Sequence, residues 1–504
     1  MAPPEANLLL VPPDTRPPTL DFPVRLAEAA GFQVAVPPRD ALPLFNQPGD
    51  RDLLVEWLRE QAAGASILIL SLETLCLGGV IPARRVTDEP VATVKRLELI
   101  PELKKLNPKL RILAGGVIVR VARDDDPFEE KPYYGEYGHD LRSYSEALDR
   151  YHRLRTRDDE RRLQRAVAKV PSDILDDWLD TRRRNHEIHL RALELIDAKS
   201  IDHLCLTLDD TSEYGLAARD RRALEARTDD LALWDRVDIY PGADEVPVTL
   251  LARAVQDRAT QVRVRYSGVA GSTAELLYED RRAGELVKAH LRAAGCALAE
   301  PRDEADLVLA VNTPGSAQSH EQPDYLTVDT PARHLPEFVD FMVAAMQANV
   351  PLTLADIAYP NGAEVRLLQL MKPRVPLAKL AGYSGWNTAA NTLGSAIAMG
   401  VVSKAMRDPA AWTEVLFNRL VDDYLYQARV RSEVDESLQY PSPFDLGSKK
   451  QAAEVLIEQR LRPLALELWS EQFAATGLEL AWREPHLAWS RLFTGVFPFR
   501  VSSR

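Results

Sequence analysis

The chain has 504 residues, of which 46% are hydrophobic and 27% charged, and it carries a formal net charge of -13 at pH 7. This length predicts two or three compact units, or one large barrel with attachments. The charged fraction excludes a membrane bundle, and the acidic balance argues against a protein that binds nucleic acid by neutralising phosphates. The three cysteines, Cys76, Cys205 and Cys296, show no metal-ligand spacing. We therefore expect a cytoplasmic protein that has no metal site or cofactor and no nucleic-acid or membrane partner.

Short apolar runs alternate with amphipathic helical stretches along most of the chain, a rhythm that indicates a largely parallel sheet or barrel. Strands are predicted at residues 8–11, 67–71, 111–114, 203–208, 237–240, 262–266, 352–355 and 380–383, with a further short run at 32–36. Eight strands with intervening helices favour an α/β fold of the (β/α)8 TIM-like barrel type. Two doubly wound domains are the main alternative.

The predicted barrel is interrupted at several places along the chain. Two long charged helices are too long for a simple barrel connection and predict an inserted helical hairpin. The resulting division is a first barrel part at 1–142, the hairpin at 143–200, a barrel continuation at 201–268, a small flavodoxin-like α/β excursion at 269–330, the barrel end at 331–404 and a C-terminal helical region at 405–504.

Two adjacent carboxylates, Asp209 and Asp210, follow the strand predicted at 203–208. Burying such a pair is costly unless the groups are exposed, paired or metal-bound. Side chains alternate along a strand, so both can act at one site only if the chain bends where the strand ends. One carboxylate would then orient a substrate group, while the other, with a raised pKa, would transfer a proton. The competing interpretation, equally open, is that one caps the next helix and the other faces water.

Polar residues also follow the other predicted strands, and the carboxyl ends of barrel strands form the functional face. The residues predicted to bind substrate there are Asp14, Arg16, Glu73, Tyr240, Asp356, Asn361, Tyr383, Trp386, Asn387 and Thr388. Trp386 offers a flat face of the kind on which pyranose rings stack, and Asn387 and Thr388 suit hydroxyl groups. Asp14 and Arg16 are expected to form an ion pair. A structural role competes at each position, such as Thr388 acting as a helix N-cap.

Motifs spread along the whole chain carry a family resemblance. They are residues 12–17 (Pro-Pro-Asp-Thr-Arg-Pro) with 21–23, Ser71-Leu72-Glu73 with Gly78-Gly79, Asp209-Asp210, residues 240–245, Asp356 with Asn361-Gly362, and residues 385–388. On these motifs the chain resembles the bacterial family called domain of unknown function 4127. Its first motif tends toward Pro-Leu-Asp, from which Pro13 departs. The resemblance implies no activity.

The Asp209-Asp210 pair also resembles, locally, the acidic pair that ends the fourth strand in barrels that cleave N-acetylhexosaminides with help from the substrate's own acetamide. This resemblance implies that Asp209 orients the acetamide and that Asp210 is the general acid/base. We therefore expect a glycosidase-like hydrolase acting on a small-molecule or oligosaccharide substrate. One alternative is a divalent-metal site of Asp14, Asp209, Asp210 and Asp356 for a phosphorylated substrate. The other is a non-catalytic carbohydrate-binding protein that uses Trp386.

Overall fold

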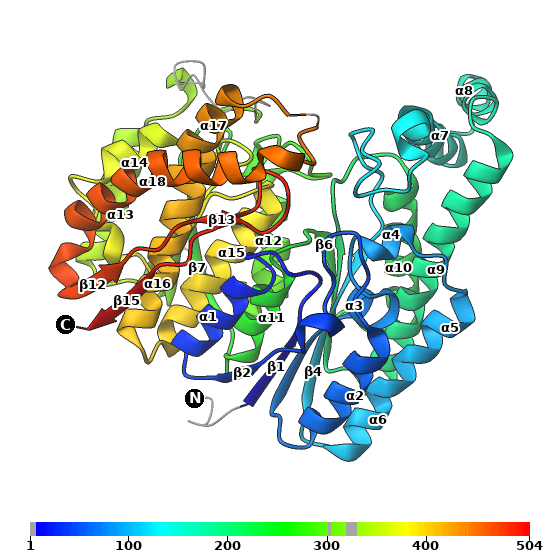
Figure 1. Cartoon of the computed structure of the whole chain (residues 1–504), viewed down its shortest axis with the longest axis horizontal. Helices are drawn as coiled ribbons and strands as arrows, with labels where there is room; N and C mark the ends of the chain where they lie inside the picture. Colours follow the sequence, from blue (N-terminus) through cyan, green and yellow to red (C-terminus); the bar gives the residue numbers. More distant parts are fainter. Residues whose placement is uncertain (1–6, 301–303, 319–329, 441, 504) are drawn as a thin grey trace. The chain divides into compact units, whose positions relative to one another are not determined.

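The computed structural model of the chain describes residues 7–300, 304–318, 330–440 and 442–503 (Figure 1). The protein has a mixed α/β fold built on two parallel sheets. It divides into two compact units, and the chain passes between them more than once. Unit 2 contains residues 6–15 and 34–247, while unit 1 contains residues 16–33 and the chain from residue 248 onward.

Unit 2 is built on a six-stranded sheet. Its strands are β1 (Asn7–Val11), β2 (Gln33–Ala35), β3 (Ile67–Ser71), β4 (Arg111–Ile118), β5 (His203–Leu208) and β6 (Val237–Pro241), in the order β2-β1-β3-β4-β5-β6. The pairs from β1 through β6 are parallel, with registers such as Leu10 opposite Ile69 and Leu206 opposite Ile239. This is the order of a doubly wound sheet, in which the connections reverse direction between β1 and β3.

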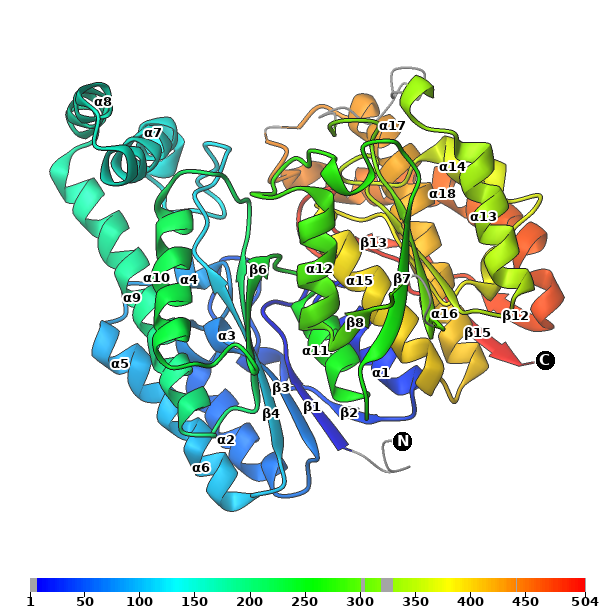
Figure 2. The same ribbon diagram turned by 180° about the vertical axis from the view of Figure 1, so that it is seen from behind.

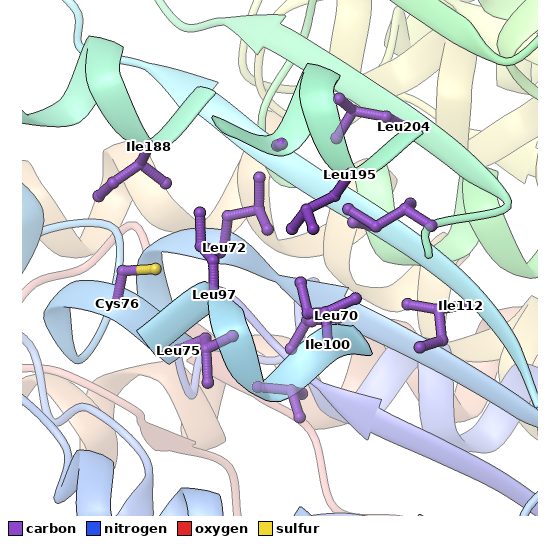
Figure 3. Packing of buried hydrophobic residues seen from close by; sticks show 14 of the residues in the cluster. Leu70, Leu72, Leu75, Cys76, Leu97, Ile100, Ile112, Ile188, Leu195 and Leu204 are labelled. Atoms are coloured by element: carbon purple, nitrogen blue, oxygen red, sulfur yellow. The ribbon is translucent and has the colours of Figure 1, made fainter. Parts of the chain in front are cut away.

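Helices cover one face of this sheet with apolar side chains (Figures 1 and 2). They include α2 (Arg51–Ala62), α3 (Leu72–Leu77), α5 (Pro90–Lys95), α6 (Leu99–Leu106), α9 (Ser172–Asp197) and α10 (Leu216–Asp230). Strand residues such as Leu70, Ile112 and Leu204 meet helix residues such as Ile100 and Leu195 in this core (Figure 3). Because side chains alternate between the two faces of a strand, Leu204 on β5 points toward the helices, and the residues on either side of it point to the opposite face of the sheet.

The long charged stretch between β4 and β5 forms three helices, α7 (Tyr134–Leu154), α8 (Arg157–Val167) and α9. Pro171 directly precedes α9. Side chains of α7, α8 and the first half of α9 pack in a small hydrophobic cluster around Trp178. The segment that follows β5 is bonded to α7, because Gly215 N donates to Asp149 Oδ2 (3.1 Å) and Leu216 N donates to Ser145 Oγ (2.8 Å). The helices thus lie beside the carboxyl end of β5.

Unit 1 is built on a second, five-stranded parallel sheet. Its strands are β7 (Thr260–Tyr266), β8 (Cys296–Leu298), β9 (Leu307–Asn312), β10 (Leu352–Asp356) and β11 (Gly382–Ser384), in the order β11-β10-β9-β7-β8. Read from its other edge, this order repeats that of the first five strands of unit 2. The connections in unit 1 accordingly reverse direction between β7 and β9.

The helices of unit 1 include one that is buried along its whole length. They are α1 (Asp21–Ala29), α12 (Ala283–Ala293), α13 (Leu335–Gln347), α14 (Val365–Met371), α15 (Ala389–Val402), α16 (Pro409–Arg419), a π-helical segment (Leu420–Val430), α17 (Arg431–Ser437) and α18 (Lys450–Gln472). The fully buried helix α15 packs on β9, β10 and β11. Small residues permit this approach, since a Cβ on Gly382 would lie 2.7 Å from Met399 Cβ. Two short antiparallel pairs near the C-terminus, β12 (Leu478–Ala481) with β15 (Arg500–Ser503) and β13 (His486–Leu487) with β14 (Gly495–Val496), complete the unit.

The two open sheets correct the expectation of a closed (β/α)8 barrel. All eight predicted strands form, but five belong to the first sheet and three to the second. The run at residues 307–312, assigned to an excursion, is the central strand β9, paired with both β7 and β10. Barrels and doubly wound sheets share the same alternation of strands and helices, so the periodicity does not distinguish them. Within the described residues, no helix is long and apolar enough to cross a lipid bilayer.

Candidate functional site

Unit 2 carries a cluster of charged side chains beyond the carboxyl ends of β4 and β5. Its members, here called the Arg–Asp cluster, are Arg84, Arg120, Glu129, Glu130, Asp209 and Asp210. Arg84 comes from the short helix α4 (Pro82–Arg85), and Arg120 follows β4. The connections after three neighbouring parallel strands, β3, β4 and β5, therefore deliver these groups to the carboxyl end of the sheet.

The chain bends at Asp210 and turns both carboxylates toward the same arginine. Asp210 has a φ of 47°, in the left-handed region that few residues other than glycine adopt. Nη1 of Arg120 lies 3.2 Å from Oδ2 of Asp210 and 3.6 Å from Oδ2 of Asp209. Nη2 of Arg84 donates to Oδ2 of Asp209 at 3.2 Å. The structure therefore has the bend that Asp209 and Asp210 need in order to act at one site.

Glu129 and Glu130 complete the cluster through contacts with both guanidinium groups. Arg120 donates to Glu129 (2.9 Å) and Glu130 (3.0 Å), and Arg84 donates to Glu130 (3.1 Å). The glutamate side chains are 9% and 6% exposed, whereas those of Asp209 and Asp210 are 20% and 19% exposed. Solvent therefore reaches the two aspartates more than the two glutamates, which are buried with the arginines.

The cluster changes the pKa values of its members. Burial, and next the charge of Asp209, raise the pKa of Asp210 to about 6, against the opposing effect of Arg120, Arg123 and Arg84. Burial alone would lower the pKa of Arg120, but Glu129, Glu130 and the two aspartates raise it well above its usual value. Arg120 therefore stays charged, and Asp210 can exchange a proton close to neutral pH.

Glu73 and Asp14 follow the two strands that flank the reversal point of unit 2. Oε1 of Glu73 accepts from Val117 N (2.7 Å) and lies 3.3 Å from Nε2 of His189 on α9. Asp14, like Glu73, is buried, and the loop that holds it is tied to α3 because Thr74 Oγ1 donates to Pro12 O (2.6 Å). Both predicted residues thus lie at the carboxyl edge of the unit 2 sheet, in buried positions.

Unit 1 has a separate, fully buried polar network at the carboxyl ends of β9 and β10. Arg333 forms two hydrogen bonds with Glu364 (2.6 and 2.9 Å), and Asn312 Nδ2 donates to both Asp356 (2.8 Å) and Glu364 (2.8 Å). Glu364 N donates to the other oxygen of Asp356 at 2.8 Å. Burial, and next the charge of Glu364, raise the pKa of Asp356 to about 7. Asp356 therefore serves a buried network rather than an open strand end.

The predicted residues after β11 are also tightly packed. Trp386 is 3% exposed and its ring stacks on Phe493, with centroids 5.4 Å apart. The side chain of Thr388 caps α15 by accepting from Asn391 N, the structural role considered for it. Asn361 N donates to Asn387 O (2.9 Å), and both asparagines have positive φ.

Tyr383 on β11 is completely buried. Burial, then the charges of Asp356 and Asp423, raise the pKa of Tyr383 far above its usual value. Asp423 itself accepts from Gly385 N (2.7 Å) and from Ser384 Oγ (3.2 Å). The π-helical segment that contains Asp423 is thereby tied to the end of β11.

The predicted site residues are thus distributed over two units. Asp14, Glu73, Asp209, Asp210 and Tyr240 belong to unit 2, while Arg16, Asp356, Asn361, Tyr383, Trp386, Asn387 and Thr388 belong to unit 1. The guanidinium carbon of Arg16 lies 4.9 Å from the ring centroid of Trp489, also in unit 1. Tyr240, on β6, is buried.

Several members of the Arg–Asp cluster and of the buried polar network of unit 1 were not predicted from the sequence. Arg120, Glu129 and Glu130 lie in the long connection after β4, and Asn312, Arg333 and Glu364 come from three separate segments of unit 1. The predicted strand ends at residue 114, whereas the observed strand β4 extends to Ile118, so the sequence did not mark Arg120 as a residue at a strand end. Only the tertiary fold brings the others to their partners.

A cavity of about 660 Å³ lies next to the reversal point of unit 1. It is lined by residues 264–272, which end β7 and continue into the next loop, and by residues 331–334 and Glu337. The exposed pair Arg265–Glu337 (2.6 Å) spans two of the lining residues. The cavity adds a hollow surface to unit 1 at the place where doubly wound sheets bind ligands.

Comparison with known proteins identifies the family. No curated protein matches the sequence. The family model described as "Protein of unknown function (DUF4127)" matches residues 8–496. The match covers nearly the whole chain and confirms the resemblance seen in the motifs, so the chain belongs to this family.

Proposed function

We propose that the chain is a hydrolase that cleaves the glycosidic bond of an N-acetylated hexosaminide, with the Arg–Asp cluster as its catalytic site. Asp210 acts as the general acid/base, and Asp209 orients the substrate's acetamide. The observation that carries the proposal is the state of Asp210, whose pKa is raised to about 6 while its side chain stays 19% exposed. A carboxylic acid with these properties is suited to proton transfer at neutral pH.

The proposed reaction has two steps. In the first, the acetamide oxygen of the substrate attacks the anomeric carbon, the bond to the leaving oxygen breaks, and Asp210 gives its proton to that oxygen. In the second, Asp210 takes a proton from water, which attacks the anomeric carbon and opens the cyclic intermediate. Asp209 accepts a hydrogen bond from the acetamide N–H throughout, as in the substrate-assisted exception to the two-carboxylate mechanism.

The two arginines support different roles for the two aspartates. Arg84 donates to Asp209 at 3.2 Å, while Asp210 accepts from Arg120 at 3.2 Å, and Arg120 also pairs with three other carboxylates. The positive charge available to Asp210 is therefore divided among several anions. The negative charge of the neighbouring Asp209 further raises the pKa of Asp210.

The proposal rests on the Arg–Asp cluster and not on a barrel, because the sheets are open. The metal-site alternative required Asp356 as a ligand, but both carboxylate oxygens of Asp356 accept hydrogen bonds within a fully buried network. The carbohydrate-binding alternative required an open face on Trp386, which is buried against Phe493. These observations favour the acid/base hydrolase over both alternatives.

The test uses aryl N-acetylhexosaminides whose leaving groups differ in acidity. Asp210→Asn should reduce hydrolysis by about 100-fold or more for poor leaving groups, the usual contribution of a general acid. The loss should be much smaller for a dinitrophenyl leaving group, which departs without protonation. Equal losses for all leaving groups would remove Asp210 from the acid role.

Asp209→Asn gives the complementary result. It should reduce hydrolysis of every N-acetylated substrate, because acetamide attack precedes departure of any leaving group. With the wild-type enzyme, the first product should retain the anomeric configuration of the substrate, which proton NMR reports directly. Asp235→Asn is a matched control, since that side chain is 71% exposed and outside the cluster. Inversion of configuration would contradict the substrate-assisted route.

A further inference from the structure

Three potential metal ligands meet on the face of the unit 2 sheet that points away from the leucine core. His203 and Cys205 are two residues apart on β5, so both side chains project from the same face. Cys205 is the direct cross-strand partner of Asp238 on β6. The side chains of all three are buried, with exposures of 5%, 0% and 3%. Strand pairing alone therefore places an imidazole, a thiol and a carboxylate side by side.

The distances among these groups approach those of a metal centre. Nε2 of His203 lies 3.0 Å from Oδ2 of Asp238, and one ligand atom from each of the three residues lies within 4.8 Å of the others. Tetrahedral zinc with bonds of about 2.0–2.3 Å holds its ligand atoms roughly 3.3–3.8 Å apart. Small side-chain rotations therefore suffice to surround an ion. Within the described part of the chain, this is the only group of three such side chains that converges in this way.

The composition of this face is unusual for its position. Strands buried on both faces in a parallel sheet are normally rich in Val, Ile and Leu. On β5, the helix-covered face follows that rule with Leu204, Leu206 and Leu208. The opposite face instead begins with His203 and Cys205, next to the carboxylate of Asp238. A bound cation would stabilise both the carboxylate and a thiolate at this buried position, where ionised groups are otherwise costly.

We propose that His203, Cys205 and Asp238 bind a divalent ion of the zinc class. Mixed nitrogen, sulfur and oxygen donors suit zinc better than magnesium or calcium, which take oxygen ligands. Binding forms bonds from the metal to the imidazole, the thiolate and the carboxylate, and it releases the thiol proton to solvent. Three protein ligands leave a fourth position for a solvent molecule. The site is independent of the proposed hydrolase activity, which uses other residues.

The test measures the metal content of the full-length protein. Protein produced in zinc-supplemented cells should contain about one equivalent of zinc per chain by elemental analysis. Protein produced in cobalt medium should show the near-ultraviolet charge-transfer absorption of a cobalt–thiolate bond. Cys205→Ser should lose both the metal and the absorption. Cys296→Ser, which also removes one thiol, should retain both.

Asp238→Asn provides a second variant in case Cys205→Ser does not fold. It keeps the side-chain shape and the cysteine, so it should retain the cobalt–thiolate absorption but bind the metal more weakly. Folded wild-type protein that contains neither zinc nor the cobalt–thiolate absorption would overturn the proposal. A cobalt–thiolate band of unchanged intensity in Cys205→Ser would overturn it as well, because another cysteine would then be the ligand.

Discussion

The raised pKa of Asp210 predicts a specific dependence of stability on pH. In the folded protein the pKa rises from 3.8 to about 6, so the folded state keeps this proton over a range in which the unfolded chain has lost it. A group of this kind stabilises the protein at low pH, and its contribution is lost as the pH rises through the folded pKa. A shift of this size corresponds to at most about 3 kcal/mol.

Replacement of Asp210 by Asn removes this titration and keeps the side-chain shape. The free energy of unfolding of the wild-type protein should therefore fall relative to that of Asp210→Asn by up to about 3 kcal/mol between pH 4 and pH 7. The change should be concentrated between pH 4 and 6. Urea unfolding at a series of pH values measures this difference.

Two comparisons make the experiment specific. Asp235→Asn removes an exposed carboxylate outside the cluster and serves as the control for the loss of one side-chain charge. A constant difference between wild type and Asp210→Asn from pH 4 to 7 would refute the reasoning, because Asp210 would then titrate alike in the folded and unfolded chain. A difference that grows in the opposite direction would mean that the arginines outweigh burial.

Three further predictions follow from the same networks. Arg120→Met should destabilise the protein by about 3–5 kcal/mol in urea unfolding, because four carboxylates share that guanidinium. It should also raise the pKa of Asp210, which Arg120 lowers, and a variant with unchanged stability and unchanged Asp210 pKa would contradict the assigned contacts. Arg333→Met leaves Glu364 buried without its ion-pair partner and should lower the free energy of unfolding by about 3–5 kcal/mol. Arg265→Met breaks an exposed ion pair and should lower it by only about 0–1 kcal/mol. Equal effects of the two substitutions would argue against the burial of the Arg333–Glu364 pair. Thr388→Ala should lower the free energy of unfolding by about 1 kcal/mol through loss of the α15 N-cap, whereas Thr388→Ser should keep most of this stability because it keeps the hydroxyl group. A Ser variant as unstable as the Ala variant would point to lost packing of the methyl group.

The strands could be predicted from the sequence, but their arrangement could not. Apolar runs such as residues 8–11 identify strands because a parallel strand that is buried on both faces is rich in Val, Ile and Leu. Closure of a sheet depends instead on which strands pair across long separations. The pairing of β9 with both β7 and β10 creates the second sheet, and this pairing leaves no local pattern.

The candidate site was partly predictable for a similar reason. Asp209 and Asp210 are conspicuous because two acids directly follow an apolar strand. Their partners Glu129 and Glu130 lie about 80 residues earlier in an irregular connection, and nothing local links them to the pair. For Trp386 the residue type was misleading, because a side chain suited to sugar stacking is buried against Phe493 in the fold.

Hydrolysis of a phenyl N-acetylhexosaminide, which has a poor leaving group, by wild type and by Asp210→Asn tests the proposed function most directly. We predict measurable turnover by the wild type, with an alkaline limb in kcat/KM near pH 6, and a loss of about 100-fold or more in the variant. Turnover by Asp210→Asn at the wild-type rate, or folded wild-type protein that hydrolyses no N-acetylhexosaminide, would contradict the assignment.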